Sequence, residues 1–144
     1  MAVEILPIRV PVRSRRFDLF KSLAGFEFQA DDILVISSKY VSISEGRTVK
    51  LSSVKPSARA LAIAKEAEME PFMAELVLRE SDYILRGVAG FLLTIKDGMI
   101  APNAGIDRSN VPHGYAVLYP TRPFESAHLL RRKFQDLLGI RVGI

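Results

Sequence analysis

The chain has 144 residues, of which 49% are hydrophobic and 25% charged, and its formal net charge at pH 7 is +4. This length and composition are typical of one globular domain, which we expect to span residues 1–144. The chain has no cysteine, so disulfides, thiolate metal sites and cysteine catalysis are excluded, and a reducing cytoplasm is the expected location. The apolar runs are far shorter than a membrane span, and the N-terminus lacks the basic region of a signal peptide. We therefore expect a soluble protein without membrane contact.

Two basic clusters stand out, Arg13 with Arg15 and Arg16 near the start, and residues 131–133 near the end. A positive field attracts phosphates, in nucleotides, in nucleic acid or in an anionic cofactor. The second cluster is better interpreted as the solvated face of a helix. Because the aromatic residues of a single-strand nucleic-acid platform are missing, nucleic acid is not the expected partner.

In the first third of the chain, apolar patterns predict β-structure with one short helix. The helix is expected at 17–23, closed by Gly25. Pro7 and Pro11 restrict the first strand to a sheet edge, and the apolar run 33–36 is typical of a buried strand. The predicted β segments are 4–12, 33–36, 40–44 and the surroundings of 49–51.

The rest of the chain alternates helices with a hairpin. Helices are expected at 56–67, at 71–79 and at 123–138, the last with an apolar stripe and with Gly139 at its end. The clearest hairpin signal is the Asp97-Gly98 turn between 90–95 and 99–101. Strands are also expected at 115–119 and 140–144. The order predicts an α+β fold with a mixed, largely antiparallel sheet, hairpins and about four helices.

The loop after the hairpin, residues 102–111, carries the polar groups that most favour chemistry. Asp107 supplies the hard oxygen that Mg²⁺ or Mn²⁺ prefers, and Asn103 and Asn110 can hydrogen-bond a base, ribose or phosphate. Gly105 permits close approach of the backbone. These residue types are also ordinary turn formers, so on spacing alone a plain loop is the better interpretation.

A second polar segment, Ser37-Ser38-Lys39, follows the apolar run 33–36. The end of such a strand is where α/β proteins place ligands, although the pattern of a P-loop is absent. On its own the segment is better interpreted as a capped strand end. His113 and His128 have no partner spacing for zinc or a triad, so no catalytic residue is assigned.

Taken together, these segments resemble the γ-glutamyl ligases of the deazaflavin coenzyme F-420 over nearly the whole chain. The matching motifs, in chain order, are Ser37-Ser38-Lys39, Ser42-Ile43-Ser44-Glu45-Gly46-Arg47, Pro-Ser-x-x-Ala at 56–60, Glu80-Ser81, and Asn103-Ala104-Gly105-Ile106-Asp107 followed by Ser109-Asn110-Val111. The resemblance implies an enzyme that couples GTP hydrolysis to amide formation between the coenzyme precursor and L-glutamate. It also implies activation of a carboxylate as an acyl phosphate, with Mg²⁺ or Mn²⁺ neutralising charge on the transferred phosphoryl group.

The resemblance also implies site residues and makes the 103–110 loop a predicted site. Asp107 corresponds to a metal ligand of the family, and Asn110 to a GTP contact. Ser37 and Ser38 match the nucleotide-binding pair. The N-terminal segment that contacts the nucleotide in the family is matched more loosely, by Pro11, Val12 and Arg13.

The sequence departs from the family in two respects. Ile43 stands where the family usually has a nucleotide-contacting lysine, and an isoleucine cannot neutralise phosphate. The family's C-terminal portion, which continues into an Asp-Thr metal pair, does not follow residues 142–143. Two hypotheses therefore remain. One is a member of the ligase family that is shortened here or completed by another chain, and the other is a non-catalytic binding or assembly module with a ligase-like fold. The apolar segment 140–144, as an unpaired strand edge, predicts a homo-oligomer, most simply a dimer.

Overall fold

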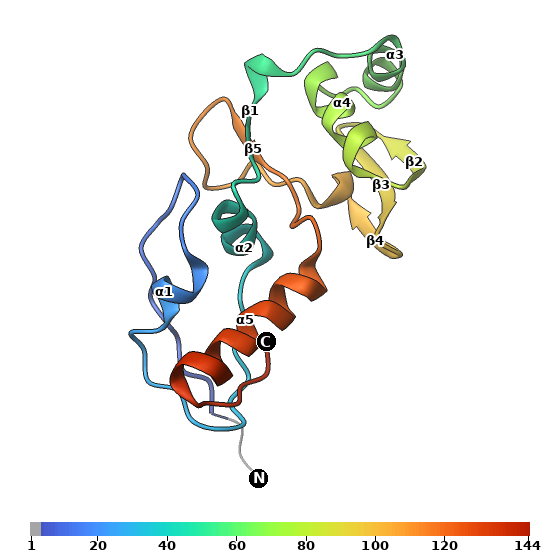
Figure 1. Cartoon of the computed structure of the whole chain (residues 1–144). Helices are drawn as coiled ribbons and strands as arrows, with labels where there is room; N and C mark the ends of the chain where they lie inside the picture. The colour runs from blue at the N-terminus through green and yellow to red at the C-terminus, as the bar shows by residue number, and fades with distance from the viewer. Residues whose placement is uncertain (1–3) are drawn as a thin grey trace. The chain divides into compact units, whose positions relative to one another are not determined.

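The computed structural model describes residues 4–144, which fall into two compact units (Figure 1). The first unit contains the residues up to Gly46 together with 121–144, and the second contains residues 47–120. The expectation that residues 1–144 form one domain stays a prediction. Among the described residues, no helix combines the length and apolarity that a bilayer crossing requires.

The predicted α+β class is confirmed. Both sheets in the described part of the chain are antiparallel, one with strand order β2-β3-β4 and one formed by β1 and β5. The helices are α1 (Leu19–Leu23), α2 (Ser38–Glu45), α3 (Ala58–Glu66), α4 (Pro71–Glu80) and α5 (Pro123–Leu138). The strands are β1 (Thr48–Lys50), β2 (Tyr83–Val88), β3 (Phe91–Lys96), β4 (Met99–Pro102) and β5 (Tyr115–Val117).

The core of the first unit forms around Phe134 on α5. Its ring makes edge-on contacts with Phe20 at 5.4 Å and with Phe28 at 5.0 Å between centroids. Helix α5 has the predicted bounds, begins with a proline and ends before Gly139. Only the middle of its predicted apolar stripe is buried, because Phe124 and Leu137 at the two ends are exposed.

Three predicted β segments of the first unit are wrong. Residues 4–12 form no strand, since Pro7 and Pro11 have no N–H groups to pair. Residues 33–36 are not a fully buried strand, because their pairing is limited to a bridge between Ile33 and Gly143, and Ile33 is exposed. Residues 40–44 belong to helix α2, which ends at Gly46 with a left-handed φ of 78°.

The predicted strand 140–144 is neither a full strand nor an unpaired edge. Its backbone pairs in parallel with residues 31–34: the N–H of Gly143 donates to Asp32 O at 2.7 Å, and the N–H of Leu34 donates to Gly143 O at 2.9 Å. Val142 is fully buried in the core around Phe134. The edge on which the dimer prediction rested is therefore already paired within the unit.

In the second unit, helices α3 and α4 form a closely packed pair, as expected from the sequence. Ala60 of α3 and Ala74 of α4 are both fully buried, and such small side chains let two helices approach closely. The hydroxyl of Ser57 accepts the N–H of Ala60 and caps α3. Pro71 occupies the first turn of α4.

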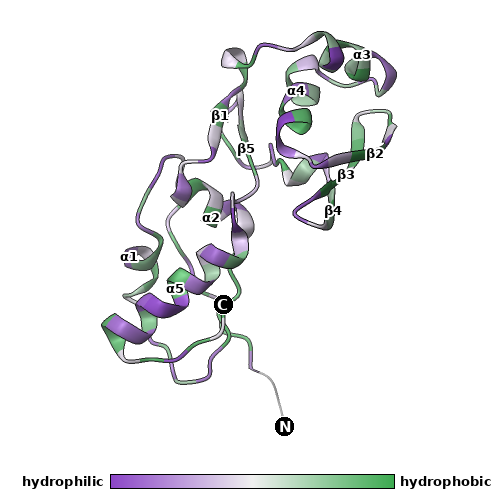
Figure 2. Ribbon diagram, turned by 45° about the vertical axis from the view of Figure 1, so that its right-hand side comes forward, coloured by the Kyte–Doolittle hydropathy of each residue, from purple (hydrophilic) through white to green (hydrophobic). Residues whose placement is uncertain are grey.

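The predicted hairpin is confirmed as β3 and β4 around the Asp97-Gly98 turn, but strand β2 was not predicted. Along β3 the side chains alternate, with Leu92, Thr94 and Lys96 buried. The opposite side, which we call the outer face of the sheet, is largely apolar, and Figure 2 shows β3 in the hydrophobic colour. From the strand register it carries Tyr83, Val88, Phe91, Leu93, Ile95, Ile100 and Pro102, together with the charged Arg86 opposite Leu93.

Candidate functional site

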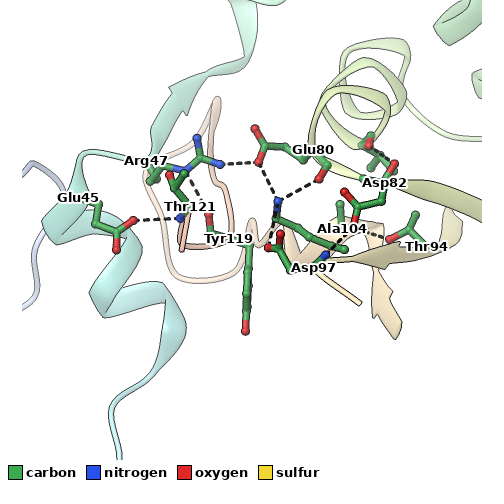
Figure 3. Close-up of polar contacts among 12 residues, drawn as sticks. Glu45, Arg47, Glu80, Asp82, Thr94, Asp97, Ala104, Tyr119 and Thr121 are labelled. Atoms are coloured by element: carbon green, nitrogen blue, oxygen red, sulfur yellow. Dashed lines mark hydrogen bonds and ion pairs between the residues drawn. The ribbon is translucent and has the colours of Figure 1, made fainter. Parts of the chain in front are cut away.

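The predicted loop begins as a single 3-10 turn, Asn103–Gly105, directly after β4. The side chain of Asn103 accepts the N–H of Leu92 at 2.9 Å, and the N–H of Ala104 donates to the buried hydroxyl of Thr94 at 3.0 Å (Figure 3). Asn103 and Ala104 both have positive φ. Asn103 thus fastens the loop to β3 through its side-chain oxygen.

Gly105 lies against the ring of Tyr119. A Cβ at this position would stand 2.7 Å from the ring atom Cδ2, and the φ of Gly105 is +71°. Both the space and the backbone conformation therefore require glycine. The backbone of Gly105 is closely approached by another group, and that group is the ring of Tyr119.

Asp107 is held at both its backbone and its side chain. Its N–H donates to Val117 O at 2.9 Å, and its carbonyl accepts the N–H of Val117 at 2.8 Å. Its Oδ1 accepts the N–H of Ser109 at 2.7 Å, the local turn that short acidic side chains commonly form. Asn110 follows, exposed and with a φ of +54°. The loop therefore brings the Asp107 carboxylate and the Asn110 amide into one fixed turn.

The residues around Asp107 offer few further metal ligands. In the described residues 4–144, no group of three or more His, Asp or Glu side chains converges. The neighbouring Arg108 pairs with Glu70 and lies 5.8 Å from the ring centroid of Phe72, so the Glu70 carboxylate on this flank is already engaged by a cation. One carboxylate is what Mg²⁺ uses when nucleotide phosphates and water supply its other ligands. The donor set fits a metal that arrives with a nucleotide and does not fit a cage built from protein side chains alone.

A network of charged side chains lies in the same unit, and the sequence did not predict it (Figure 3). Arg47 pairs with Glu80 at the end of α4, and its Nε donates to Tyr119 O at 3.1 Å. Lys96 donates to Glu80 O at 3.0 Å and lies 3.6 Å from Asp97. Two signals pointed to it: Arg47 and Glu80 stand in the family motifs, and Lys96 occupies an inward position of an apolar strand.

In the first unit, Ser37 and Ser38 lie at the start of helix α2 and are exposed. The Ser37 side chain makes no capping hydrogen bond, and its carbonyl accepts the N–H groups of Tyr40 at 2.9 Å and Val41 at 3.2 Å. The start of a helix attracts anions. Ile43 lies on the same helix and is only 6% exposed, so its side chain belongs to the interior.

The N-terminal segment reaches the same helix through a stack of side chains. The Arg13 guanidinium lies 5.4 Å from the centroid of the Phe17 ring, and that ring lies 4.7 Å from the ring of Tyr40 in the first turns of α2. Pro11 and Val12 are exposed and take no part in this stack. Of the three predicted residues, the structure connects only Arg13 to the helix that carries Ser38.

Residues 16–144 match the protein family described as F420-0:gamma-glutamyl ligase. The chain belongs to this ligase family. The resemblance stated from the motifs is thereby confirmed.

Curated relatives match the chain from end to end but are longer. A coenzyme F420:L-glutamate ligase of Methanopyrus kandleri is 35% identical, and one of Archaeoglobus fulgidus is 36% identical; both matches cover 100% of this chain. A third, from Methanocaldococcus jannaschii, is 30% identical over 99% of the chain. The matched regions are 58%, 59% and 58% of those proteins. The chain thus spans about three fifths of the length of these ligases.

Several motif residues of the ligase family have structural roles here. Glu45 accepts a hydrogen bond from the N–H of Thr121 (Figure 3). It also accepts one from the hydroxyl of Ser126, and so fixes the start of α5 to the end of α2. Ser57, in the Pro-Ser-x-x-Ala motif, donates its N–H to Glu75 at 2.8 Å. Hydrogen bonds from the hydroxyl and the amide of Ser57 and from Arg79 lower the pKa of Glu75 to about 2.

The predicted site residues divide between the two units. Asp107 and Asn110 share one turn of the second unit, and Arg13, Ser37 and Ser38 belong to the first. The sequence located the Asp107 loop, because its turn-forming residues are contiguous. It did not predict the contacts of that loop with Val117, the last residue of β5, and with Tyr119, two residues beyond it.

Proposed function

We propose that the chain is part of a γ-glutamyl ligase that depends on GTP and a divalent metal and acts on the precursor of the deazaflavin coenzyme. In this reaction the γ-phosphoryl group of GTP passes to a carboxylate of the precursor, giving an acyl phosphate and GDP. The amine of L-glutamate then attacks the acyl carbon, the amide bond forms and phosphate leaves. Membership of the ligase family supports this proposal, and the absence of cysteine agrees with a cytoplasmic reaction.

The observation that carries the proposal is the fixed turn at Asp107 and Asn110. A carboxylate whose backbone is paired and whose Oδ1 is hydrogen-bonded loses little freedom when it binds a ligand. In the proposed complex Asp107 contributes one oxygen to Mg²⁺ or Mn²⁺, and Asn110 donates to the nucleotide. When bound, the metal would lower the negative charge around the phosphoryl group.

The first unit supports a second part of the proposal, a role in phosphate binding. The start of α2 carries N–H groups, the Ser37 and Ser38 hydroxyls are exposed, and Arg13 approaches the same helix through Phe17. These are the donor types that bind phosphate oxygens. We assign Ser37, Ser38 and Arg13 as phosphate donors, with Pro11 and Val12 as flanking backbone.

Isothermal titration calorimetry with GTP, in the presence and absence of Mn²⁺, tests the proposal on this chain. The variants are Asp107→Ala and a matched control, Asp136→Ala, which removes an exposed carboxylate of α5. Metal-dependent binding that is lost in Asp107→Ala and kept in Asp136→Ala would support the proposed roles. Binding that is equal with and without Mn²⁺ and unchanged in Asp107→Ala would refute the assignment of Asp107.

The alternative is a non-catalytic module that keeps the ligase fold and binds or assembles with another protein. Two observations favour it: Ile43 is buried where the family usually has a lysine, and residues 4–144 contain no group of three or more His, Asp or Glu side chains that could hold a metal. In that case Asp107→Ala would change no ligand binding and only the local stability of the loop. The calorimetric comparison therefore separates the two functions.

We also propose that the chain forms a homo-oligomer, most simply a dimer, through the outer face of the sheet. Residues 140–144, on which the dimer prediction was based, already pair with residues 31–34. We therefore place the dimer contact on the outer face instead. An apolar sheet face is normally covered by a second layer. A second copy of the same face provides that layer in a two-fold contact, because the face is largely apolar and its charged residue, Arg86, lies exposed on the edge strand β2, where a long side chain can keep its charge in solvent.

A further inference from the structure

The short segment 117–119 packs against the Asp107 loop and pairs with it. Asp107 exchanges two backbone hydrogen bonds with Val117, at 2.9 and 2.8 Å. Two residues further on, the ring of Tyr119 fills the space beside Gly105, at the start of the loop. The position of the Asp107 backbone is therefore determined by the position of this segment.

Arg47 contacts that segment at Leu118 and Tyr119. Its backbone carbonyl accepts the N–H of Leu118 at 3.0 Å, and its side-chain Nε donates to Tyr119 O at 3.1 Å. The backbone contact is an ordinary continuation of the pairing between β1 and β5. The side-chain contact is different, because only an arginine can donate from Nε to one acceptor while its terminal nitrogen binds another.

Glu80 and Lys96 keep the Arg47 guanidinium in place. Glu80 pairs with the terminal nitrogen of Arg47 and also lies 3.8 Å from Lys96 Nζ. The side chains of Arg47, Glu80 and Lys96 are 23%, 15% and 11% exposed, so none of the charges is fully hydrated. Partly buried charges are stable only with partners, and each member therefore restricts the others.

We infer that Arg47 is a positioning residue for Asp107. Held by Glu80, it fixes segment 117–119, and that segment fixes the turn that presents the Asp107 carboxylate. The inference about metal affinity rests on the proposed function, whereas the inference about the order of the loop rests on the contacts alone. The substitution Arg47→Lys keeps the positive charge but removes the simultaneous contacts with Tyr119 O and Glu80.

The first measurement is hydrogen exchange at the amides of Asp107 and Val117, followed by NMR without metal or nucleotide. In Arg47→Lys we expect both amides to exchange about tenfold faster than in the unsubstituted chain, because a charge-assisted hydrogen bond of the supporting segment is lost. The amides of β3 should be unchanged. Arg59→Lys, an exposed position on α3, is the matched control.

The second measurement is the affinity for Mn²⁺ in the presence of GTP, followed by the EPR signal of free Mn²⁺. We expect weaker binding by Arg47→Lys, by about five- to tenfold, and unchanged binding by Arg59→Lys. Binding equal to that of the unsubstituted chain would overturn the inference. So would exchange that is unaltered at Asp107 and Val117, or uniformly faster throughout the second unit. If the unsubstituted chain binds no Mn²⁺, the proposed function fails for this chain, and the exchange measurement alone decides the role of Arg47.

Discussion

The aromatic ring of Tyr119 lies directly against Gly105, 14 residues earlier in the sequence, and leaves no room for a side chain there. Gly98, in the hairpin turn, has a similar φ of +74° but open space around it. The two glycines therefore separate the cost of backbone strain from the cost of a steric clash.

We predict that Gly105→Ala destabilises the second unit by about 3 kcal/mol, because overpacking adds to the strain of a left-handed alanine. The matched control Gly98→Ala should cost only about 1 kcal/mol, the strain alone. Urea unfolding followed by circular dichroism measures both. Equal losses in the two variants would show that the Tyr119 ring moves aside.

The low pKa of Glu75 predicts a loss of stability in acid. Hydrogen bonds from Ser57 and the contact with Arg79 favour the carboxylate and lower its pKa from 4.5 to about 2. Because the folded protein binds this proton less readily than the unfolded chain, the contribution is complete above pH 4.5 and lost as the pH falls toward about 2.

Glu75→Gln should therefore be less stable than the unsubstituted chain at pH 7, and the difference should shrink between pH 4.5 and about 2. Denaturant unfolding at a series of pH values provides the measurement. Glu66→Gln, which removes an exposed carboxylate from α3, is the control. A difference between Glu75→Gln and the unsubstituted chain that stays constant over this range would contradict the assignment.

The burial of Ile43 predicts that the family's lysine cannot simply be restored. Ile43→Lys places a charge among buried groups of α2 and should cost about 3 kcal/mol of stability. Ile43→Val, which keeps the apolar character, should cost about 1 kcal/mol. Thermal unfolding together with GTP calorimetry tests this. Unchanged stability with stronger GTP binding would mean that the lysine reaches solvent beside the start of the helix.

The proposed dimer can be tested on the outer face of the sheet. Ile100 is 67% exposed on this face, whereas Leu61 is 52% exposed on α3. We expect Ile100→Lys to weaken self-association and Leu61→Lys to leave it unchanged, because a charge opposes burial of an apolar surface. Sedimentation velocity over about a hundredfold range of concentration measures the effect. A monomer at every concentration in the unsubstituted chain would refute the dimer.

The local elements were predictable because their determinants are local. Ser57 and Pro71 mark the starts of α3 and α4, Asp97-Gly98 specifies the hairpin, and Gly139 ends α5. Each of these effects acts within a few residues, through a missing N–H, a permitted φ or a capping hydroxyl. The motifs likewise located the loop that contains Asp107.

What only the tertiary structure decided depends on residues far apart in the chain. The apolar runs 4–12 and 33–36 have the composition of strands, but a strand needs a partner along its whole length. Within residues 4–144, no strand pairing is formed by 4–12, and the second run forms a single bridge, from Ile33 to Gly143. Residues 40–44 contain β-branched side chains, yet burial of Ile43 on one side of a helix outweighs that preference. The ion pair between Arg47 and Glu80 joins residues 33 positions apart. Sequence patterns report local propensity, whereas the order of the Asp107 turn comes from long-range pairing and packing, which no local propensity specifies.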